Sequence, residues 1–180
     1  MKIILILLLT LTVYANTKQT MFKLYQDQKY IKACNLGFRH FNKNDKDEEY
    51  ISLYAFSCLK ADFIDRLSIP TAMLKFSKEA RANSAYFSVI MMQKKLLYHS
   101  LIDGYDISNL NMPTTDHVLS KVFDFYTKLG KHKTKDLYIF KDKINKNLSY
   151  KLYIIKNERL SKMVIEELSD NKIIKKHLYW

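Results

Sequence analysis

Two stretches in the first half of the chain repeat apolar and small side chains every three or four residues, and each carries one of the two cysteines. The first stripe consists of Tyr30, Ala33, Cys34, Gly37 and Phe41, and the second of Tyr50, Leu53, Tyr54, Ser57, Cys58 and Ala61. This spacing places each set on one face of an α-helix. Residues 42–47 between the stripes include no apolar side chain, and they end in Asp47, a good N-cap candidate ahead of Glu48 and Glu49. The pattern predicts two antiparallel helices joined by a polar turn.

The first 15 residues have the three parts of a secretory signal peptide. Lys2 supplies the positive charge, residues 3–11 form an uncharged apolar run, and small side chains stand at Val13 and Ala15. We therefore expect cleavage between Ala15 and Asn16, leaving a soluble periplasmic protein. The alternative is an uncleaved anchor, but the apolar run is well short of the roughly 20 residues that span a bilayer.

The two cysteines of an exported chain are expected to pair, because disulfides form and persist in oxidising compartments. Cys34 lies about seven residues before the predicted end of its helix near Phe41, and Cys58 about eleven residues after Asp47. At about 1.5 Å of rise per residue, these depths differ by about one helical turn. The sequence therefore predicts a Cys34–Cys58 disulfide across the hairpin. Two buried free thiols are the alternative.

Two short segments 33 residues apart, 28–33 and 61–66, both place an aromatic residue after a short turn. In the first, Tyr30 is followed three residues later by the small Ala33, whereas in the second Phe63 is followed by Arg66. Over roughly residues 18–80 the chain thereby resembles tetratricopeptide-type helical repeats. That family holds peptide or protein segments on a concave face of stacked helices. The resemblance implies a binding surface whose candidate residues are Tyr25, Arg39, Tyr50 and Tyr54, although each side chain could equally belong to the core.

The rest of the region 16–107 also reads as helical. Pro70 is incompatible with a helix interior, so we expect a helix that restarts there, capped by Ser68, and runs to about residue 81. A longer helix capped by Asn83 or Ser84 should follow and end at Gly104. Residues 108–115 are the best linker candidate, and a further helix is expected from there to Leu129.

The C-terminal region 108–180 changes its hydrophobic period after that helix. Four short segments rich in Tyr, Ile, Leu and Val are separated by polar turns, and they cover residues 136–140, 150–156, 160–168 and 173–180. Turns at this spacing indicate an antiparallel β-meander. Residues 158–168 also fit a helical period, so a helix is the alternative there. The predicted fold class is α+β, mainly α, with N-terminal antiparallel helical hairpins followed by a small sheet.

The positive charge of the chain is concentrated near its C-terminal end. Residues 131–180 carry 13 basic and 6 acidic side chains within a chain whose formal net charge is +12. Such a field favours an anionic partner, and weak contact with an anionic membrane surface is one candidate. Codon bias toward lysine on an ordinary solvated surface is the alternative. No nucleic-acid-binding motif is present in the sequence, so we expect no nucleic-acid partner.

The sequence offers no recognisable catalytic or cofactor motif. It has three glycines, none close to another, and its five histidines include no pair at the spacing of a helical zinc site. We therefore expect no catalytic residues, no metal and no cofactor. The predicted function is non-catalytic binding of a protein or peptide in the cell envelope. The alternative is an envelope ligand-binding or hydrolytic domain with its site in the cleft between the helical and sheet parts.

Overall fold

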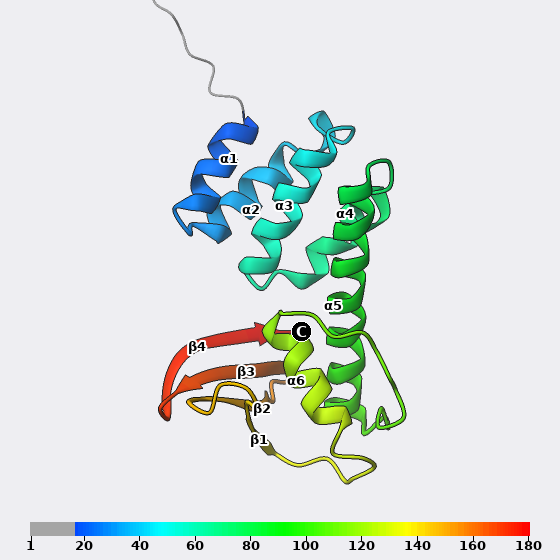
Figure 1. The fold of residues 1–180 in the computed structure, drawn as a ribbon, viewed down its shortest axis with the longest axis vertical. Helices are drawn as coiled ribbons and strands as arrows, with labels where there is room; N and C mark the ends of the chain where they lie inside the picture. Colours follow the sequence, from blue (N-terminus) through cyan, green and yellow to red (C-terminus); the bar gives the residue numbers. More distant parts are fainter. Residues whose placement is uncertain (1–16) are drawn as a thin grey trace, which may run out of the picture.

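The computed structural model describes residues 17–180. The expected signal peptide and its cleavage site between Ala15 and Asn16 lie outside the described residues. Helices α1 to α4 gather at one end of the molecule and a sheet at the other, while the long helix α5 runs alongside both (Figure 1). The fold class is therefore α+β, as predicted.

The N-terminal end contains α1 (Thr17–Gln26), α2 (Tyr30–Arg39), the short 3₁₀ helix η1 (Phe41–Lys43) and α3 (Glu48–Lys60). The predicted cap at Asp47 is confirmed, because its carboxylate accepts a hydrogen bond from the amide of Tyr50 at 3.0 Å. Helix α2 packs between its neighbours at Gly37, where a Cβ atom would lie 2.6 Å from the Tyr54 ring and 2.8 Å from the sulfur of Met21. A larger side chain at Gly37 would push these helices apart.

Helices α1 and α3 end in the same kind of turn. Gln28 and Asp62 both adopt the left-handed conformation, with φ of 58° and 64°. In each turn the following amide donates to a carbonyl five residues earlier, at 2.8 and 2.9 Å, which completes a Schellman-type cap. The equivalent turn residues are 34 positions apart, one more than the separation of the two segments compared in the sequence. The tetratricopeptide-type resemblance itself stays a prediction.

The segment around Pro70 differs from the prediction. The chain forms η2 (Ile64–Leu67) and a short α4 (Ser68–Met73), and then α5 (Lys78–Asp103) begins with Ser77 as its N-cap. The helix expected to end at residue 81 therefore ends eight residues earlier, and the expected caps Asn83 and Ser84 lie inside α5. Glu48 explains the break, because its carboxylate accepts hydrogen bonds from the amides of residues 75, 76 and 77 at 2.8–3.0 Å.

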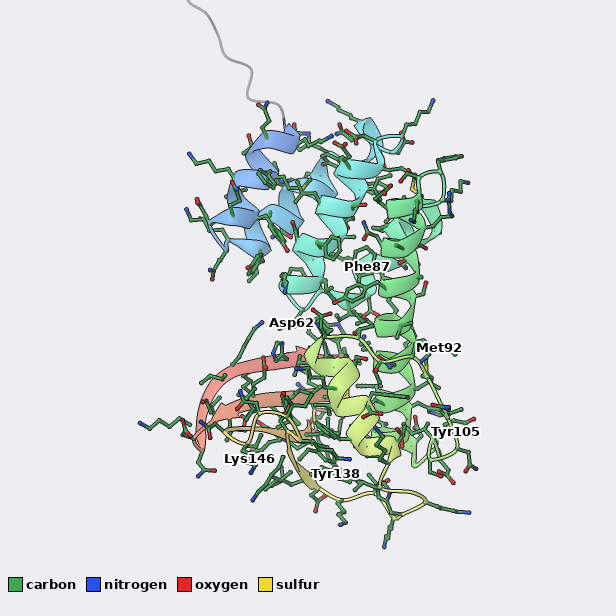
Figure 2. All side chains as sticks on the ribbon, in the orientation of Figure 1. Asp62, Phe87, Met92, Tyr105, Tyr138 and Lys146 are labelled. Atoms are coloured by element: carbon green, nitrogen blue, oxygen red, sulfur yellow. A yellow bond between two sulfur atoms is a disulfide. The ribbon has the colours of Figure 1, made fainter. Side chains whose placement is uncertain are left out.

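Helix α5 contacts both ends of the molecule. Near its start, Phe87 points toward α3 and stacks edge-on against Phe56 with ring centroids 4.8 Å apart (Figure 2). Near its end it packs against α6 (Val118–Thr127) and contacts β2. Gly104 caps α5 with φ of 71°, as predicted. The hydroxyls of Ser100 on α5 and Tyr126 on α6 share a buried hydrogen bond of 2.9 Å.

The C-terminal end is an antiparallel sheet of four strands in sequence order, so the β-meander is confirmed. Its strands are β1 (Leu137–Lys141), β2 (Leu148–Ile155), β3 (Lys162–Ser169) and β4 (Lys172–Tyr179). The alternative of a helix over residues 158–168 was wrong, because β3 pairs with strands on both sides. The inner face of the sheet stacks against α6: Phe125 lies 5.7 Å from Phe140 and 5.9 Å from Tyr150, measured between ring centroids.

Candidate functional site

The helical end carries a groove of about 290 Å³ between the end of α2, the helix α3 and the short α4. Its lining residues are Phe38, Arg39, Phe41, Asn42, Tyr54 and Ile69. Phe38 and Ile69 are more than half exposed, at 57% and 55%, although both are large and apolar. Phe41 forms the floor with Tyr54, their ring centroids 5.4 Å apart. The groove therefore offers an apolar surface that water covers in the free protein.

Arg39 is the charged residue of this groove. Its guanidinium is exposed and forms no ion pair or hydrogen bond with another residue in the part of the chain that the structure describes. A guanidinium presents several N–H donors in a planar fork that matches a carboxylate. The groove thus combines apolar walls with one available positive charge.

The structure separates the four side chains suggested as a binding surface. Arg39 and Tyr54 both line the groove, but Tyr54 is a core residue that is only 3% exposed, so its suggested role as an exposed contact is corrected. Tyr50 is fully buried and donates a hydrogen bond to the carbonyl of Gly37 at 2.9 Å, so its suggested role as an exposed contact is corrected to that of a core residue. Tyr25 is half-buried on α1, where its ring meets Tyr30 edge-on at 5.3 Å. The sequence analysis assigned Phe41 to the apolar stripe of a helix and did not single out Phe38 or Ile69, since exposure of an apolar side chain is decided by the packing of distant helices.

Cys34 and Cys58 form a disulfide between α2 and α3, with their Cα atoms 4.7 Å apart. Both residues are fully buried. Arg66 of η2 lies against this bridge, its Nη1 atom 3.4 Å from the Cys34 sulfur and 2.8 Å from the Asn35 side-chain oxygen. The bridge thus fastens the two helices whose ends form the groove.

A second group of functional-looking side chains lies where the helical end meets the sheet. Asp62 stands at the turn after α3, close to the sheet (Figure 2). His177 of β4 contacts its carboxylate through Nδ1 at 2.8 Å, and contacts the carboxylate of Glu167 through Nε2 at 2.9 Å. The Tyr179 hydroxyl also donates to Asp62, at 3.3 Å. No signal in the local sequence links these residues, because 115 positions separate Asp62 from His177.

This arrangement favours the charged form of His177. Burial alone lowers the pKa of His177, but the hydrogen bonds to Asp62 and Glu167 outweigh it, so that the pKa is raised above the ordinary 6.5. Glu167 responds in the opposite direction: its hydrogen bond to His177 lowers its pKa. In the charged form both ring nitrogens of His177 donate to carboxylates, and neither has a lone pair with which to remove a proton. The cluster acts as an ionic link between the two ends of the molecule.

Beside this cluster lies a junction pocket of about 250 Å³, lined by residues 62–66, Lys94, Tyr179 and Trp180. The Lys94 side chain is buried, and its ammonium binds the Asp65 carboxylate at 2.7 Å and the main-chain oxygen of Trp180. Lys94 and Asp65 thus already pair with each other. The charged side chains of the pocket therefore already have partners within the protein.

His117 illustrates a histidine whose role is structural. It is the N-cap of α6, and its Nδ1 atom accepts a hydrogen bond from the amide of Leu119 at 3.3 Å. Burial lowers the pKa of His117 to about 4. The neutral ring is needed, since a protonated Nδ1 could not accept this hydrogen bond.

Two further properties bear on function. Among residues 17–180, no group of three or more histidine, cysteine or acidic side chains is arranged to hold a metal ion. Within the same range, no helix has both the length and the apolar character needed to cross a membrane.

Comparison with models of known protein families, with curated proteins and with solved structures gives no match.

Proposed function

We propose that this protein is an exported, non-catalytic binding protein that captures a peptide segment in the groove at its helical end. The single observation that carries the proposal is the unpaired Arg39 guanidinium beside Phe38 and Ile69, two apolar side chains left more than half exposed. The segment that fits this groove presents an aliphatic or aromatic side chain next to an acidic group. Burial of the apolar side chain supplies affinity and the carboxylate supplies orientation.

The groove is preferred over the junction pocket because their polar groups differ in availability. In the junction pocket, Asp62 is bound by His177 and Asp65 by Lys94, so a ligand would have to displace bonds that already exist. A hydrolytic site also needs a group that can take up a proton, and both ring nitrogens of His177 already contact carboxylates. Within the described part of the chain, Arg39 has no existing bond that a ligand would have to displace, which supports a binding role for the helical end.

Export is the second part of the proposal. It is supported by the composition of residues 1–15 and by a disulfide of a kind that persists in oxidising compartments such as the periplasm. Intact-mass measurement of protein recovered from the periplasm should give a chain that begins at Asn16. Recovery of membrane-bound protein that retains Met1 would contradict this part.

The binding role can be tested by peptide display against immobilised protein comprising residues 16–180. We expect enrichment of peptides that combine a large apolar side chain with an aspartate or glutamate. An Arg39→Glu variant should select lysine or arginine in place of the acid, because the charge at the groove is inverted. A Phe38→Ala variant should weaken binding of the enriched peptides without changing their charge preference.

Lys23→Glu is a matched control, since Lys23 is an exposed cation on α1 outside the groove. It changes the net charge as Arg39→Glu does and should leave the selected peptides unchanged. If the enriched peptides keep their acidic residues with Arg39→Glu, or lose them equally with Lys23→Glu, the groove is not the site.

A further inference from the structure

The outer face of the sheet, which lies opposite the face packed on α6, carries a second and independent surface. Strand alternation assigns its side chains, because residues two apart in a strand share a face. In β1 the inward Tyr138 and Phe140 are buried, whereas the outward Leu137 and Ile139 are 46% and 61% exposed. The strand register then places Tyr153 beside Leu137. The outer face is thus defined without reference to the groove.

This face is more apolar than the solvent side of an antiparallel sheet normally is. Its apolar residues are Leu137, Ile139, Tyr153, Ile155, Leu178 and the adjoining Trp180. Four of them, the three aliphatic residues of β1 and β2 and the tryptophan, are 40–61% exposed. Val164 and Leu168 of β3 lie in the same face, and both are buried without belonging to the main core. The strand register places Leu137, Tyr153, Val164 and Leu178 side by side, so an apolar layer crosses all four strands.

Lysines are interspersed through this layer. They are Lys141, Lys151, Lys162 and Lys176, one on each strand. Lys162 lies 5.6 Å above the Trp180 ring, and Lys176 lies 5.7 Å above that of Tyr153, so their stems run along the apolar surface. The one acidic residue on these strands that points outward, Glu166, is already bound by Lys176 at 3.5 Å and by the Tyr153 hydroxyl at 2.8 Å. The face is thus apolar and positively charged at once.

We propose that the outer face of the sheet docks on an anionic lipid surface. Aliphatic side chains can enter the boundary between headgroups and acyl chains, a tryptophan suits that boundary, and lysines on flexible stems meet the headgroup charges. Charge complementarity points to this occupant, because four lysines face one neutralised glutamate. This second surface does not depend on the groove, so failure of one proposal leaves the other standing.

Two other anionic partners fit the face less well. Single-stranded nucleic acid binds on platforms of aromatic rings over which bases stack, whereas Leu137, Ile139 and Ile155 are aliphatic. The centres of protein interfaces are depleted of lysine, whereas here lysines stand on every strand. Both partners are outcomes that the experiment distinguishes.

The test is co-sedimentation of protein comprising residues 16–180 with vesicles of phosphatidylcholine alone or with about a third phosphatidylglycerol added. We expect binding to the anionic vesicles and little to the neutral ones. A Lys141→Glu, Lys151→Glu variant should weaken the partition coefficient at least about 20-fold, since each lysine near an anionic surface strengthens binding roughly fivefold. Lys32→Glu with Lys78→Glu is the matched control: both are exposed on helices, carry the same charge change and should have a much smaller effect.

A second variant separates docking from general electrostatic attraction. Ile139→Ser with Ile155→Ser leaves every charge in place and removes two exposed side chains from strands β1 and β2. It should weaken binding at physiological salt, where charge attraction alone is screened over about 8 Å. Circular dichroism of each variant checks that the fold is kept.

Three results would overturn the proposal. The first is an equal loss for the control lysine pair, which would mean that net charge alone drives binding. The second is unchanged binding of the isoleucine variant. The third is the absence of binding to the anionic vesicles. Tight binding of a fluorescent single-stranded oligonucleotide or of an acidic polypeptide, lost in the Lys141→Glu, Lys151→Glu variant, would then identify the other anionic partner.

Discussion

Removing the Cys34–Cys58 bridge should lower the free energy of unfolding by about 3.5 kcal/mol. The bridge joins residues 24 positions apart, and the chain-entropy relation gives this value for a closed loop of about 25 residues. For a domain of this length, 1 kcal/mol corresponds to about 2–4 °C in the melting temperature. The reduced protein should therefore melt roughly 7–14 °C below the oxidised one. A loss of this size is a large share of a typical domain stability of about 5–15 kcal/mol.

The measurement is urea unfolding of the oxidised protein, the protein unfolded with reductant present, and a Cys34→Ala, Cys58→Ala variant. Because both cysteines are fully buried, reductant should act only after the hairpin opens, so reduction is carried out in urea. Reductant should not change the alanine variant, which serves as the control. Helix content by circular dichroism should be kept in the variant, because the apolar stripes of α2 and α3 specify the hairpin.

A loss below about 1 kcal/mol in the reduced protein would refute the reasoning, since it would mean that the unfolded chain gains little freedom when the bridge opens. Loss of helix signal in the Cys34→Ala, Cys58→Ala variant at low temperature would refute the expectation that the apolar stripes alone specify the hairpin. In that case the bridge, and not the packing of the stripes, would hold the hairpin.

Three further predictions concern single residues. Gly37→Ala should destabilise the protein by up to about 2 kcal/mol in urea unfolding, because the clash with Tyr54 outweighs the helix propensity gained; a stabilised variant would contradict the close approach. As pH rises above 6.5 the wild type should lose stability relative to His177→Gln, since a raised pKa gives stability that is full below the ordinary value and lost as pH rises through the raised one; a constant difference would contradict the ionic link. Hydrogen bonds, first from the amide of residue 76, lower the pKa of Glu48 to about 2, so the wild type should lose stability as pH falls from about 4.5 toward 2 and Glu48→Gln should lack this slope in thermal melts.

The parts of the fold that local patterns specify were predictable from the sequence. Apolar stripes at helical spacing gave the hairpin that places Cys34 opposite Cys58, and turn residues at regular spacing gave the meander. The start of α5 was not predictable in this way. Ser77 is an ordinary cap candidate, but the chain breaks before it because Glu48, 27–29 residues earlier, binds three successive amides there. A contact of this range leaves no periodic signal.

The candidate sites likewise include residues that the sequence suggested and residues joined by long-range contacts that it did not reveal. Arg39 and Tyr54, which the resemblance to helical repeats suggested, line the groove, and their role in binding stays a prediction. Tyr50 does not line it, because its hydroxyl is satisfied inside the core by the carbonyl of Gly37. The link between Asp62 and His177 was missed. The one available hint was an aspartate in a helix-ending position that usually holds glycine. The carboxylate of Asp62 binds His177, whereas a glycine there could not.

The construction of α5 has a consequence for motion. Its 26 residues form one uninterrupted helix of roughly 39 Å that contains neither proline nor glycine, the usual causes of a kink. Because α5 packs against α3 and α4 at one end and against α6 and β2 at the other, a hinge between the two ends would have to bend this helix or detach it from one of them. We therefore expect the junction pocket to keep its width on the microsecond-to-millisecond timescale of domain closure. A small molecule that enters it must fit a shape already set when the chain folded.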